Sequence, residues 1–435
     1  MYRQGLGDFF LVTLPRSGGK NFRILIDCGV ITGTPDAKNA MRSLVTQMKN
    51  DVGKRLDVVV VTHRHADHVS GFLQAEDIFK DAFDIGEVWV SWVENPRDKL
   101  GQQLLGTHAQ AERALRASAE RLRVNGSAAA EEIASLLDFR GEPLSAAATG
   151  STTDAAVDIA KKLGRLRYCR PDDKPHKLEG TGAQIFVFGP PRDLALLGRM
   201  DPSKANPETY GVTAMRSLLR DIAPALGANG GEAGSQTDDS SPFGANWKIP
   251  LDAKTVPSFF DATYFDKALA WRRIDDDWLE GTSALALAFD QAVNNTSLVL
   301  AVELDGGDVL LFAADAQVGN WLSWQALKWN LPGRGEISAS DLLKRTVFYK
   351  VGHHASHNAT LEAQGLELMD RLLYAMISVN EEMAHKKNWG QMPFPKLLTA
   401  LEKHTGSRAV RADKDIQPAA NAKVKSGPGF YELTL

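Results

Sequence analysis

The sequence predicts a mixed α/β fold, in which two groups of strands form two sheets that pack face to face and carry helices on their outer sides. Short apolar runs rich in β-branched residues occur early in the chain and again after residue 183. Helical stretches lie between and after these runs. Several strands end in histidine or aspartate, and proteins commonly place functional residues in the loops where strands end.

The first group of strands lies before residue 93. Val58–Thr62 begins with four consecutive valines, which is typical of a strand buried on both faces. A helix is expected at Ala37–Met48, and Pro15–Lys20 has turn chemistry. The other strands expected here are Asp8–Leu14, Arg23–Gly29 and Val88–Trp92.

Two regions of different composition interrupt the strands. Residues 98–180 are rich in Ala, Leu, Arg and Glu and predict a helical insertion, with helices near 108–123 and 128–137. Residues 194–290 predict a second insertion, whose Gly- and Ser-rich part at 227–245 has the composition of a flexible loop. We therefore expect residues 1–435 to form a single domain with two insertions.

The second group of strands surrounds and follows the second insertion. Asp305-Gly306-Gly307 predicts the hairpin turn between strands at Ser297–Val302 and Val309–Ala314. A helix is expected around Trp321–Trp329. The remaining expected elements are strands at Ala183–Phe188, Thr346–Val351, Ala375–Val379, Ala409–Arg411 and Phe430–Leu435, and a helix at Pro395–His404.

Composition limits the classes of function. The chain has 435 residues, of which 43% are hydrophobic and 24% are charged, with a formal net charge of -4. This charge argues against a protein that coats nucleic acid non-specifically. The two cysteines, Cys28 and Cys169, do not predict a disulfide framework. Because neither a secretory signal nor an apolar run of bilayer-spanning length is found, we expect a cytoplasmic protein that does not enter the membrane.

The strongest functional signal is the segment His63-Arg64-His65-Ala66-Asp67-His68, directly after the Val58–Thr62 strand. Imidazoles two positions apart on such a loop can converge on one cation, and the Asp-His pair just beyond them can bind a second. Neutral imidazole and carboxylate are ligands that Zn²⁺ and Mn²⁺ prefer. A core-packing explanation fits poorly, because each of these polar groups would need a buried partner.

Three further strands also end in potential metal ligands. They lead to Asp27, to Asp315 and to the pair His353-His354. One such strand is easily explained by chance, whereas four indicate that the strand ends converge at one edge of the two sheets. The pattern predicts a metal site built from distant parts of the chain.

The His-x-His-x-Asp-His pattern at 63–68 resembles the motif of the metallo-β-lactamase superfamily. Other segments resemble its ComEC-type, competence nuclease-like branch: Gly7–Val12 with Ile26–Gly29, Asn295–Leu300 with Phe312–Ala316, Lys350–His357, Ile377–Asn380 and Pro393–Pro395. The similarity does not extend to 98–180 or 194–290. The resemblance implies an αββα sandwich, the metallo-β-lactamase fold, and a hydrolase that uses one or two metal ions, Zn or Mn.

The resemblance also implies a set of metal ligands. These are His63 and His65 for the first ion, Asp67, His68 and His354 for the second, and Asp315 as the bridge between them. His353 is the alternative to His354 and otherwise contacts substrate, while Asp27 orients a ligand imidazole by accepting its other N–H. The superfamily has another histidine ligand after the middle strand. Here that strand runs into Gly189-Pro190 instead, so the first site lacks one ligand.

The expected chemistry follows from the metals. A bound dication lowers the pKa of its water to about 7 and supplies hydroxide at neutral pH. Asp67 is expected to orient this hydroxide, and Lys350 and His357 are alternative general acids. The resemblance implies a phosphodiesterase or nuclease acting on nucleic acid or a small phosphodiester. Two alternatives stay open: hydrolysis of a small ester, lactone or thioester, and a regulatory or binding protein with a degenerate metal site. A protein partner bound through the insertions is a further expectation.

Overall fold

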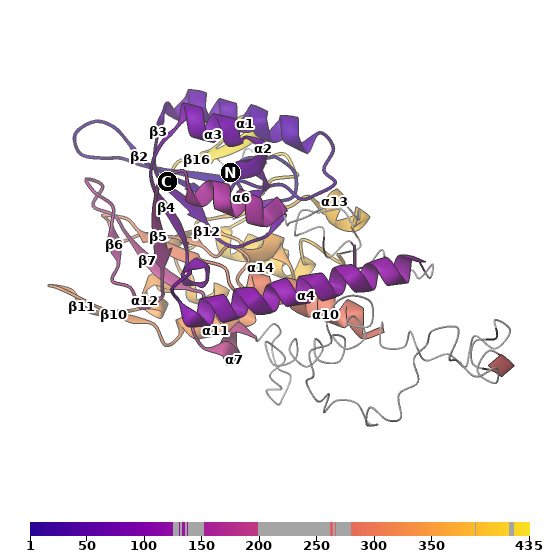
Figure 1. Ribbon diagram of the computed structural model, residues 1–435. Coiled ribbons are helices and arrows are strands. Elements are labelled where there is room, and N and C mark those ends of the chain that lie inside the picture. The colour runs from indigo at the N-terminus through magenta and orange to yellow at the C-terminus, as the bar shows by residue number, and fades with distance from the viewer. Residues whose placement is uncertain are drawn as a thin grey trace.

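The computed structural model describes residues 1–124, 152–198, 280–387, 389–416 and 422–435, together with residues 130, 133, 134, 137, 262, 263 and 266. Two mixed sheets of five and seven strands, with helices, confirm the predicted mixed α/β class (Figure 1). The segment 227–245 and most of the helix expected at 128–137 lie outside the described residues.

The five-stranded sheet is built from the first part of the chain. Its strands lie in the order β1 (Phe10–Leu14), β2 (Phe22–Ile26), β3 (Arg55–Val61), β4 (Asp84–Ser91) and β5 (Arg165–Cys169). β1 and β2 are antiparallel, whereas β2 to β5 are parallel neighbours. β5 was not expected from the sequence and lies within the range 98–180, so part of that range belongs to the sheet.

The seven-stranded sheet is built from strands that follow residue 175 in the chain. Its order is β14 (Ala409–Arg411), β13 (Tyr374–Ile377), β12 (Thr346–Lys350), β9 (Val309–Phe312), β8 (Val299–Glu303), β7 (Gln184–Gly189) and β6 (His176–Lys177). β14, β13, β12 and β9 are parallel, and β9, β8, β7 and β6 are antiparallel. Two hairpins complete the strands: β10 (Lys328–Leu331) with β11 (Gly335–Ser338), and β15 (Val424–Gly427) with β16 (Phe430–Leu433).

The helices lie between the strands in the chain. They are α1 (Ala37–Val52), α2 (Ala66–Gln74), α3 (Glu76–Ala82), α4 (Lys99–Val124), α6 (Thr152–Lys161), α7 (Leu194–Leu197), α10 (Glu280–Asn294), α11 (Val318–Trp324), α12 (Ala339–Lys344), α13 (Glu381–Lys386) and α14 (Pro395–Thr405). Short 3₁₀ turns are η1 (Trp92–Glu94), η7 (Gly352–Ala355) and η8 (Leu366–Leu368). None of the helices within the described ranges is long and apolar enough to cross a membrane.

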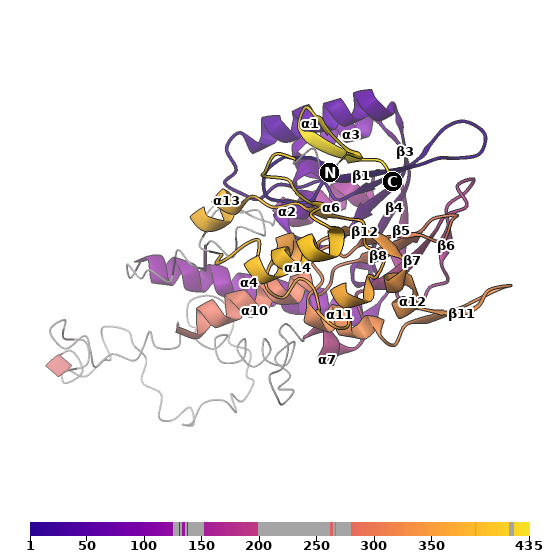
Figure 2. The same ribbon diagram turned by 180° about the vertical axis from the view of Figure 1, so that it is seen from behind.

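Three apolar clusters show how the elements stack. One lies between the two sheets and includes Val58 and Val60 of β3 with Phe312 of β9. Another joins the outer face of the five-stranded sheet to α1, α2, α3 and α6, and includes Val59 and Val61. The third joins the seven-stranded sheet to α11, α12 and α14 on the opposite side of the molecule (Figures 1 and 2). Because successive strand side chains point to opposite faces, the four valines serve both clusters.

The helix expected around Trp321–Trp329 is wrong in its second half. α11 ends at Trp324, and Trp329 lies in strand β10. The Trp329 ring packs against those of Phe186 and Phe188 of β7, with centroids 5.0 and 5.7 Å away. This packing against the sheet, which the local sequence does not reveal, outweighs the helical spacing of the tryptophans.

Candidate metal centre

The carboxyl ends of four strands supply buried polar side chains to one cluster. β2 and β3 are parallel neighbours in one sheet, and β9 and β12 are parallel neighbours in the other, so within each sheet the carboxyl ends share an edge. Asp27 follows β2 and Asp315 follows β9. The loop after β3 carries His63 and His65 and runs into α2, whose first turn holds Asp67 and His68; His354 follows β12.

Backbone conformation at these strand ends is unusual. Asp27, Ala314, His353 and His354 have φ angles of 55°, 49°, 40° and 50°. Residues other than glycine rarely adopt this left-handed region, and it recurs at functional sites whose surroundings hold it in place. The backbone is thus turned sharply at three of the four strand ends.

Four of the predicted ligands form a compact group. Ligand atoms of Asp67, His68, Asp315 and His354 all lie within 4.8 Å of one another, and all four residues are buried. His354 Nε2 lies 2.8 Å from Asp67 Oδ2, and His68 Nε2 lies 3.1 Å from Asp315 Oδ2. A second group, Asp8, Asp27 and His68, overlaps the first through its histidine. The two groups can hold one or two metal ions.

In His68 and His354, the Nδ1 atom, which faces away from the ligand group, already has a hydrogen-bond acceptor. His68 Nδ1 lies 2.7 Å from Asp27 Oδ2, and His354 Nδ1 lies 2.6 Å from the carbonyl oxygen of Ser378. Since these oxygens can only accept from the rings, each Nδ1 carries a proton. In the neutral rings, Nε2 therefore presents a lone pair to the acidic oxygens of the group.

Unpartnered buried atoms indicate that the cluster suits a cation. Among the described residues, Asp67 Oδ1, His68 Nε2 and Asp315 Oδ2 are buried and have no hydrogen-bond partner. Leaving such groups unpaired is costly, and here acceptor atoms face one another. Histidine nitrogen and carboxylate oxygen are a suitable donor set for Zn²⁺ or Mn²⁺. The cluster is therefore compatible with the active site of a metallohydrolase.

His63 and His65 lie beside this group. His63 Nε2 is 3.2 Å from His65 Nδ1 and 3.9 Å from Asp315 Oδ2. The hydroxyl of Thr62 donates to Asp27 Oδ2 at 2.6 Å and lies 3.1 Å from His63 Nδ1. With its own proton committed to Asp27, this hydroxyl accepts from His63 Nδ1, which leaves His63 Nε2 as a lone pair. Asp27 thus orients His68 directly and His63 through Thr62.

Asp8 and Lys350 form a buried ion pair against the cluster. Lys350 Nζ contacts Asp8 Oδ2, donates to the carbonyl oxygen of Ala314 at 3.1 Å and lies 3.6 Å from Asp315 Oδ1. The Lys350 side chain is only 2% exposed. Sequence reasoning placed Asp8 in a strand and missed it as a site residue. The only indication in the sequence was that Asp8 is a charged residue next to an apolar run, and such a pattern does not by itself identify a site residue.

His353 and His357 take positions different from the ligand group. The backbone N–H of His353 donates to Asp315 Oδ1 at 3.1 Å, while its ring lies 2.7 Å from Ser356 Oγ and 3.4 Å from Asn294 Nδ2. His353 therefore holds Asp315 by its main chain. His357 is exposed, with its ring 6.4 Å from that of Phe394.

The charges within the cluster favour an ionised Asp315 and a neutral His63, and they favour the protonated form of His68. Burial opposes ionisation of Asp315, but His68 and His354 outweigh it and hold its pKa well below the usual value. Burial likewise opposes the charge on His68, yet Asp315 and Asp67 outweigh it and raise its pKa well above the usual value. Burial and the charge of His68 lower the pKa of His63 well below its usual value. Asp315 stays ionised and His63 stays neutral near pH 7.

A salt-bridge network anchors the histidine loop from outside. Arg64, between His63 and His65, binds Glu94 through Nε at 2.5 Å and Nη2 at 2.6 Å. It also binds Asp154 of α6 at 2.5 Å, and Lys161 of α6 binds Glu94 at 2.5 Å. Glu94 and Lys161 are largely buried. Sequence reasoning assigned no role to Arg64, because its partners Glu94 and Asp154 lie 30 and 90 residues away.

Gly189, the last residue of β7, is closely packed against Asn320. A Cβ atom added to Gly189 would lie 2.1 Å from Asn320 Oδ1, closer than any side chain tolerates. Asn320 is fixed, since its Nδ2 donates to the carbonyl oxygens of Asn295 and Ser297 and its Oδ1 accepts from Trp324. The position therefore has no room for a ligand side chain.

Helix α10 brings two residues that sequence reasoning missed. Asp290 Oδ1 lies 3.6 Å from His65 Nε2, and Asn294 lies next to the ring of His353. Both are buried. Burial, with the charges of Asp67 and Asp315, raises the pKa of Asp290 well above its usual value. Asp290 lies at the end of the range 194–290, where no motif pointed to a site.

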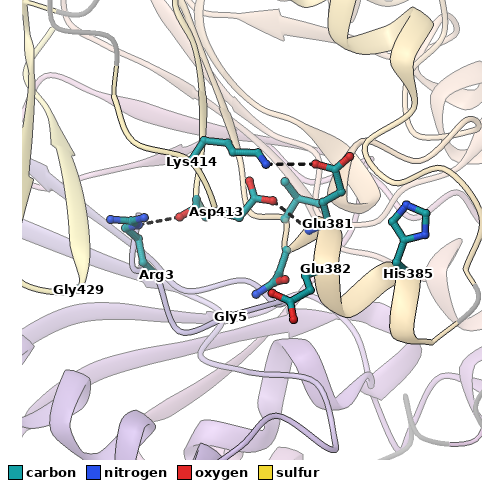
Figure 3. Close-up of a pocket in the computed structure, with 11 residues that line it drawn as sticks. Arg3, Gly5, Glu381, Glu382, His385, Asp413, Lys414 and Gly429 are labelled. Carbon is teal, nitrogen blue, oxygen red and sulfur yellow. Dashed lines mark hydrogen bonds and ion pairs between the residues drawn. The ribbon is translucent and has the colours of Figure 1, made fainter.

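A separate cavity lies between the two chain ends. It has a volume of about 570 Å³ and is lined by Arg3, Glu381, Glu382, His385, Asp413 and Lys414, among others (Figure 3). Glu381 Oε2 lies 3.4 Å from Lys414 Nζ and 2.8 Å from Arg411 Nη2, and Asp413 Oδ2 accepts the backbone N–H of Glu381 at 2.9 Å. Glu381 is thus paired with Lys414 of the cavity lining and with Arg411.

Comparison with models of protein families found no match, and none of the curated proteins compared with the chain is significantly similar to it. The buried histidine and aspartate cluster therefore identifies a candidate metal site and assigns no family.

Proposed function

We propose that this chain is a metal-dependent hydrolase of the metallo-β-lactamase fold, and that its activity is that of a phosphodiesterase or nuclease. One observation carries the proposal. Buried ligand atoms of Asp67, His68, Asp315 and His354 converge from distant segments, and three of these residues have an atom with no hydrogen-bond partner among the described residues. A cation satisfies all of them at once.

Two features support the fold assignment. Apolar clusters between and outside the sheets give the order helices, sheet, sheet, helices, which is the αββα arrangement that the motifs implied. The candidate ligands also follow the strands that those motifs would place at the site. We propose that residues 1–435 form one such domain and that a protein partner binds through the insertions.

Each side chain then has a proposed role. A divalent ion bound here supplies a Lewis acid and activates water. His63 and His65 would hold the first ion, Asp67, His68 and His354 would hold the second, and Asp315 would serve both. Lys350 balances the charges of Asp8 and Asp315 from a buried position, which suits an orienting role better than proton donation. Exposed His357 is the proposed general acid.

The substrate class rests on the motifs. Lys350–His357 and the hairpin ending in Asp315 resemble the ComEC-type branch, which favours a phosphodiester in nucleic acid or in a small molecule. The cluster geometry alone suits an ester, lactone or thioester equally well, because the same pair of ions can stabilise either transition state.

The proposal is tested by metal analysis and a substrate panel. Purified protein loaded with Mn²⁺ or Zn²⁺ is assayed on single- and double-stranded DNA, RNA, a chromogenic phosphodiester and a lactone. We expect phosphodiester cleavage that the double variant His65→Ala, Asp67→Ala abolishes. His404→Ala, in the last turn of α14, is the matched control and retains activity.

The outcomes separate the candidate functions. Hydrolysis of the lactone alone would overturn the phosphodiesterase assignment and keep the hydrolase. Full activity in the double variant would show that the site is wrong. Protein that binds no metal after prolonged exposure would favour the regulatory or binding protein.

A further inference from the structure

The first half of the metal centre contains a buried carboxylate that the motifs do not include. Asp290 of α10 has Oδ1 3.6 Å from His65 Nε2, and this oxygen has no hydrogen-bond partner among the described residues. Its other oxygen, Oδ2, accepts from Asn294 Nδ2 at 3.3 Å. The Asp290 side chain is 9% exposed. An acid so nearly buried, aimed at a candidate ligand, calls for a positive or proton-bearing partner.

The tautomer of His65 determines what Asp290 does. His63 Nε2 is a lone pair, because its Nδ1 donates to the Thr62 hydroxyl, and it lies 3.2 Å from His65 Nδ1. For the two rings to share one cation, His65 Nδ1 must also present a lone pair. The proton of His65 then lies on Nε2, which is the atom that faces Asp290.

The second half of the centre also has an aspartate behind a histidine, at hydrogen-bond distance rather than at 3.6 Å. There Asp27 accepts the Nδ1 proton of His68 at 2.7 Å and leaves Nε2 toward the ligand group. A carboxylate behind a ligand imidazole fixes its orientation and raises its basicity. Each half would thus have its own aspartate, Asp27 for His68 and Asp290 for His65. Orientation of His65 matters more in the first half, because this chain lacks the additional histidine that the resemblance implies there.

We propose that Asp290 is a positioning residue for the first metal ion: its Oδ1, 3.6 Å from His65 Nε2, favours the tautomer with the proton on Nε2 and so directs Nδ1 toward the ion. This inference rests on the proposed function, since it assumes that His63 and His65 bind a metal. It also gives α10 a role in the site, although the helix lies in a range that the motifs left out.

Helix α4 holds α10 in place. Leu115 and Ala119 of α4 belong to one apolar cluster with Phe289 and Val293 of α10, and the two helices lie side by side (Figures 1 and 2). Phe289 directly precedes Asp290, so this cluster sets the position of the carboxylate. In this proposal the α4–α10 contact supports the first half of the metal centre.

Metal affinity tests the proposal without reference to turnover. Zn²⁺ or Mn²⁺ binding is measured by competition with a chelator, and the first ion is defined as the one lost in His65→Ala. We expect Asp290→Asn to lower the affinity for this ion about 10- to 100-fold and to leave the affinity for the other ion unchanged. Asp290→Glu, which keeps the carboxylate, should recover part of the loss, and Gln291→Ala, next along α10, should bind as the wild type does.

Two spectroscopic readouts distinguish positioning from a purely structural role or direct ligation. In Co²⁺-loaded protein, the absorption spectrum at full occupancy should be nearly the same in Asp290→Asn and wild type. A changed ligand field would make Asp290 a direct ligand and overturn the positioning role. In metal-loaded wild type, ¹⁵N NMR of labelled histidine should show His65 protonated at Nε2, and protonation at Nδ1 would overturn the proposal even if the variants fail to fold.

The failure of this inference differs from the failure of the proposed function. Wild-type protein that binds no ion refutes both. Wild-type protein that binds an ion dependent on His65, with equal affinity in Asp290→Asn, refutes only the role of Asp290.

Discussion

Replacing Asp27 with asparagine should disable the second metal site by forcing a histidine into the wrong tautomer. Asp27 Oδ1 accepts the backbone N–H of Thr62 at 2.8 Å, and Oδ2 faces His68 Nδ1 at 2.7 Å. In Asp27→Asn the amide oxygen is needed by Thr62, so the amide NH₂ turns toward His68. Nδ1 then becomes an acceptor, and the proton moves to Nε2, the atom that faces Asp315.

The expected loss follows from the hydrogen bonds involved. Restoring the metal-binding tautomer places two donors against each other in a fully buried site, which costs about 1 to 3 kcal/mol. That range corresponds to roughly 5- to 150-fold weaker binding of the second ion at 25 °C. Binding of the first ion should also weaken, because the Thr62 hydroxyl loses Asp27 Oδ2 as its acceptor and can then donate to His63 Nδ1.

Chelator competition with Zn²⁺ or Mn²⁺ measures this loss directly. Asp57→Asn is the matched control, since Asp57 is also buried but lies toward the other end of β3, where it accepts the backbone N–H of Arg23 at 2.9 Å. If Asp27→Asn bound both ions with affinities within twofold of those of the wild type, the argument from the His68 tautomer would be refuted.

Three other predictions concern stability. Metal at a hundred times its dissociation constant should raise the free energy of unfolding by about 2.7 kcal/mol, and a chelator should reverse the shift in melting temperature; an unchanged melting temperature would count against the site. Burial opposes ionisation of Glu94, but Arg64 outweighs it and lowers the pKa from 4.5 to about 2. Because this pKa is depressed on folding, its contribution of about 3 kcal/mol is present above pH 4.5 and is lost as the pH falls toward 2, so Glu94→Gln should flatten the acid limb of urea-unfolding curves. Gly189→Ala should cost about 1 to 3 kcal/mol by overpacking against Asn320, whereas Gly306→Ala, which meets open space, should change the unfolding midpoint little.

Local patterns were sufficient to predict most strands near the site. The valine run and its histidine loop appear as β3 and the start of α2, and the hairpin around Asp305-Gly306-Gly307 appears as β8 and β9. Both signals are local, because a run of β-branched residues and turn chemistry act between neighbours in the chain. Strand β5 and the strand conformation of Trp329 escaped prediction, since both depend on pairing or packing with distant segments.

The sequence by itself determined which side chains are suited to bind a metal, since the capacity of histidine and aspartate to act as metal ligands depends on the residue type. Only the tertiary structure decided which of them meet, and it added Asp8, Asp290 and the Arg64–Glu94 anchor, whose partners are remote in the chain. It also decided that Gly189 must stay small. The physical reason is that ligand geometry and close packing are set by distances across the two sheets, and a linear pattern does not contain those distances.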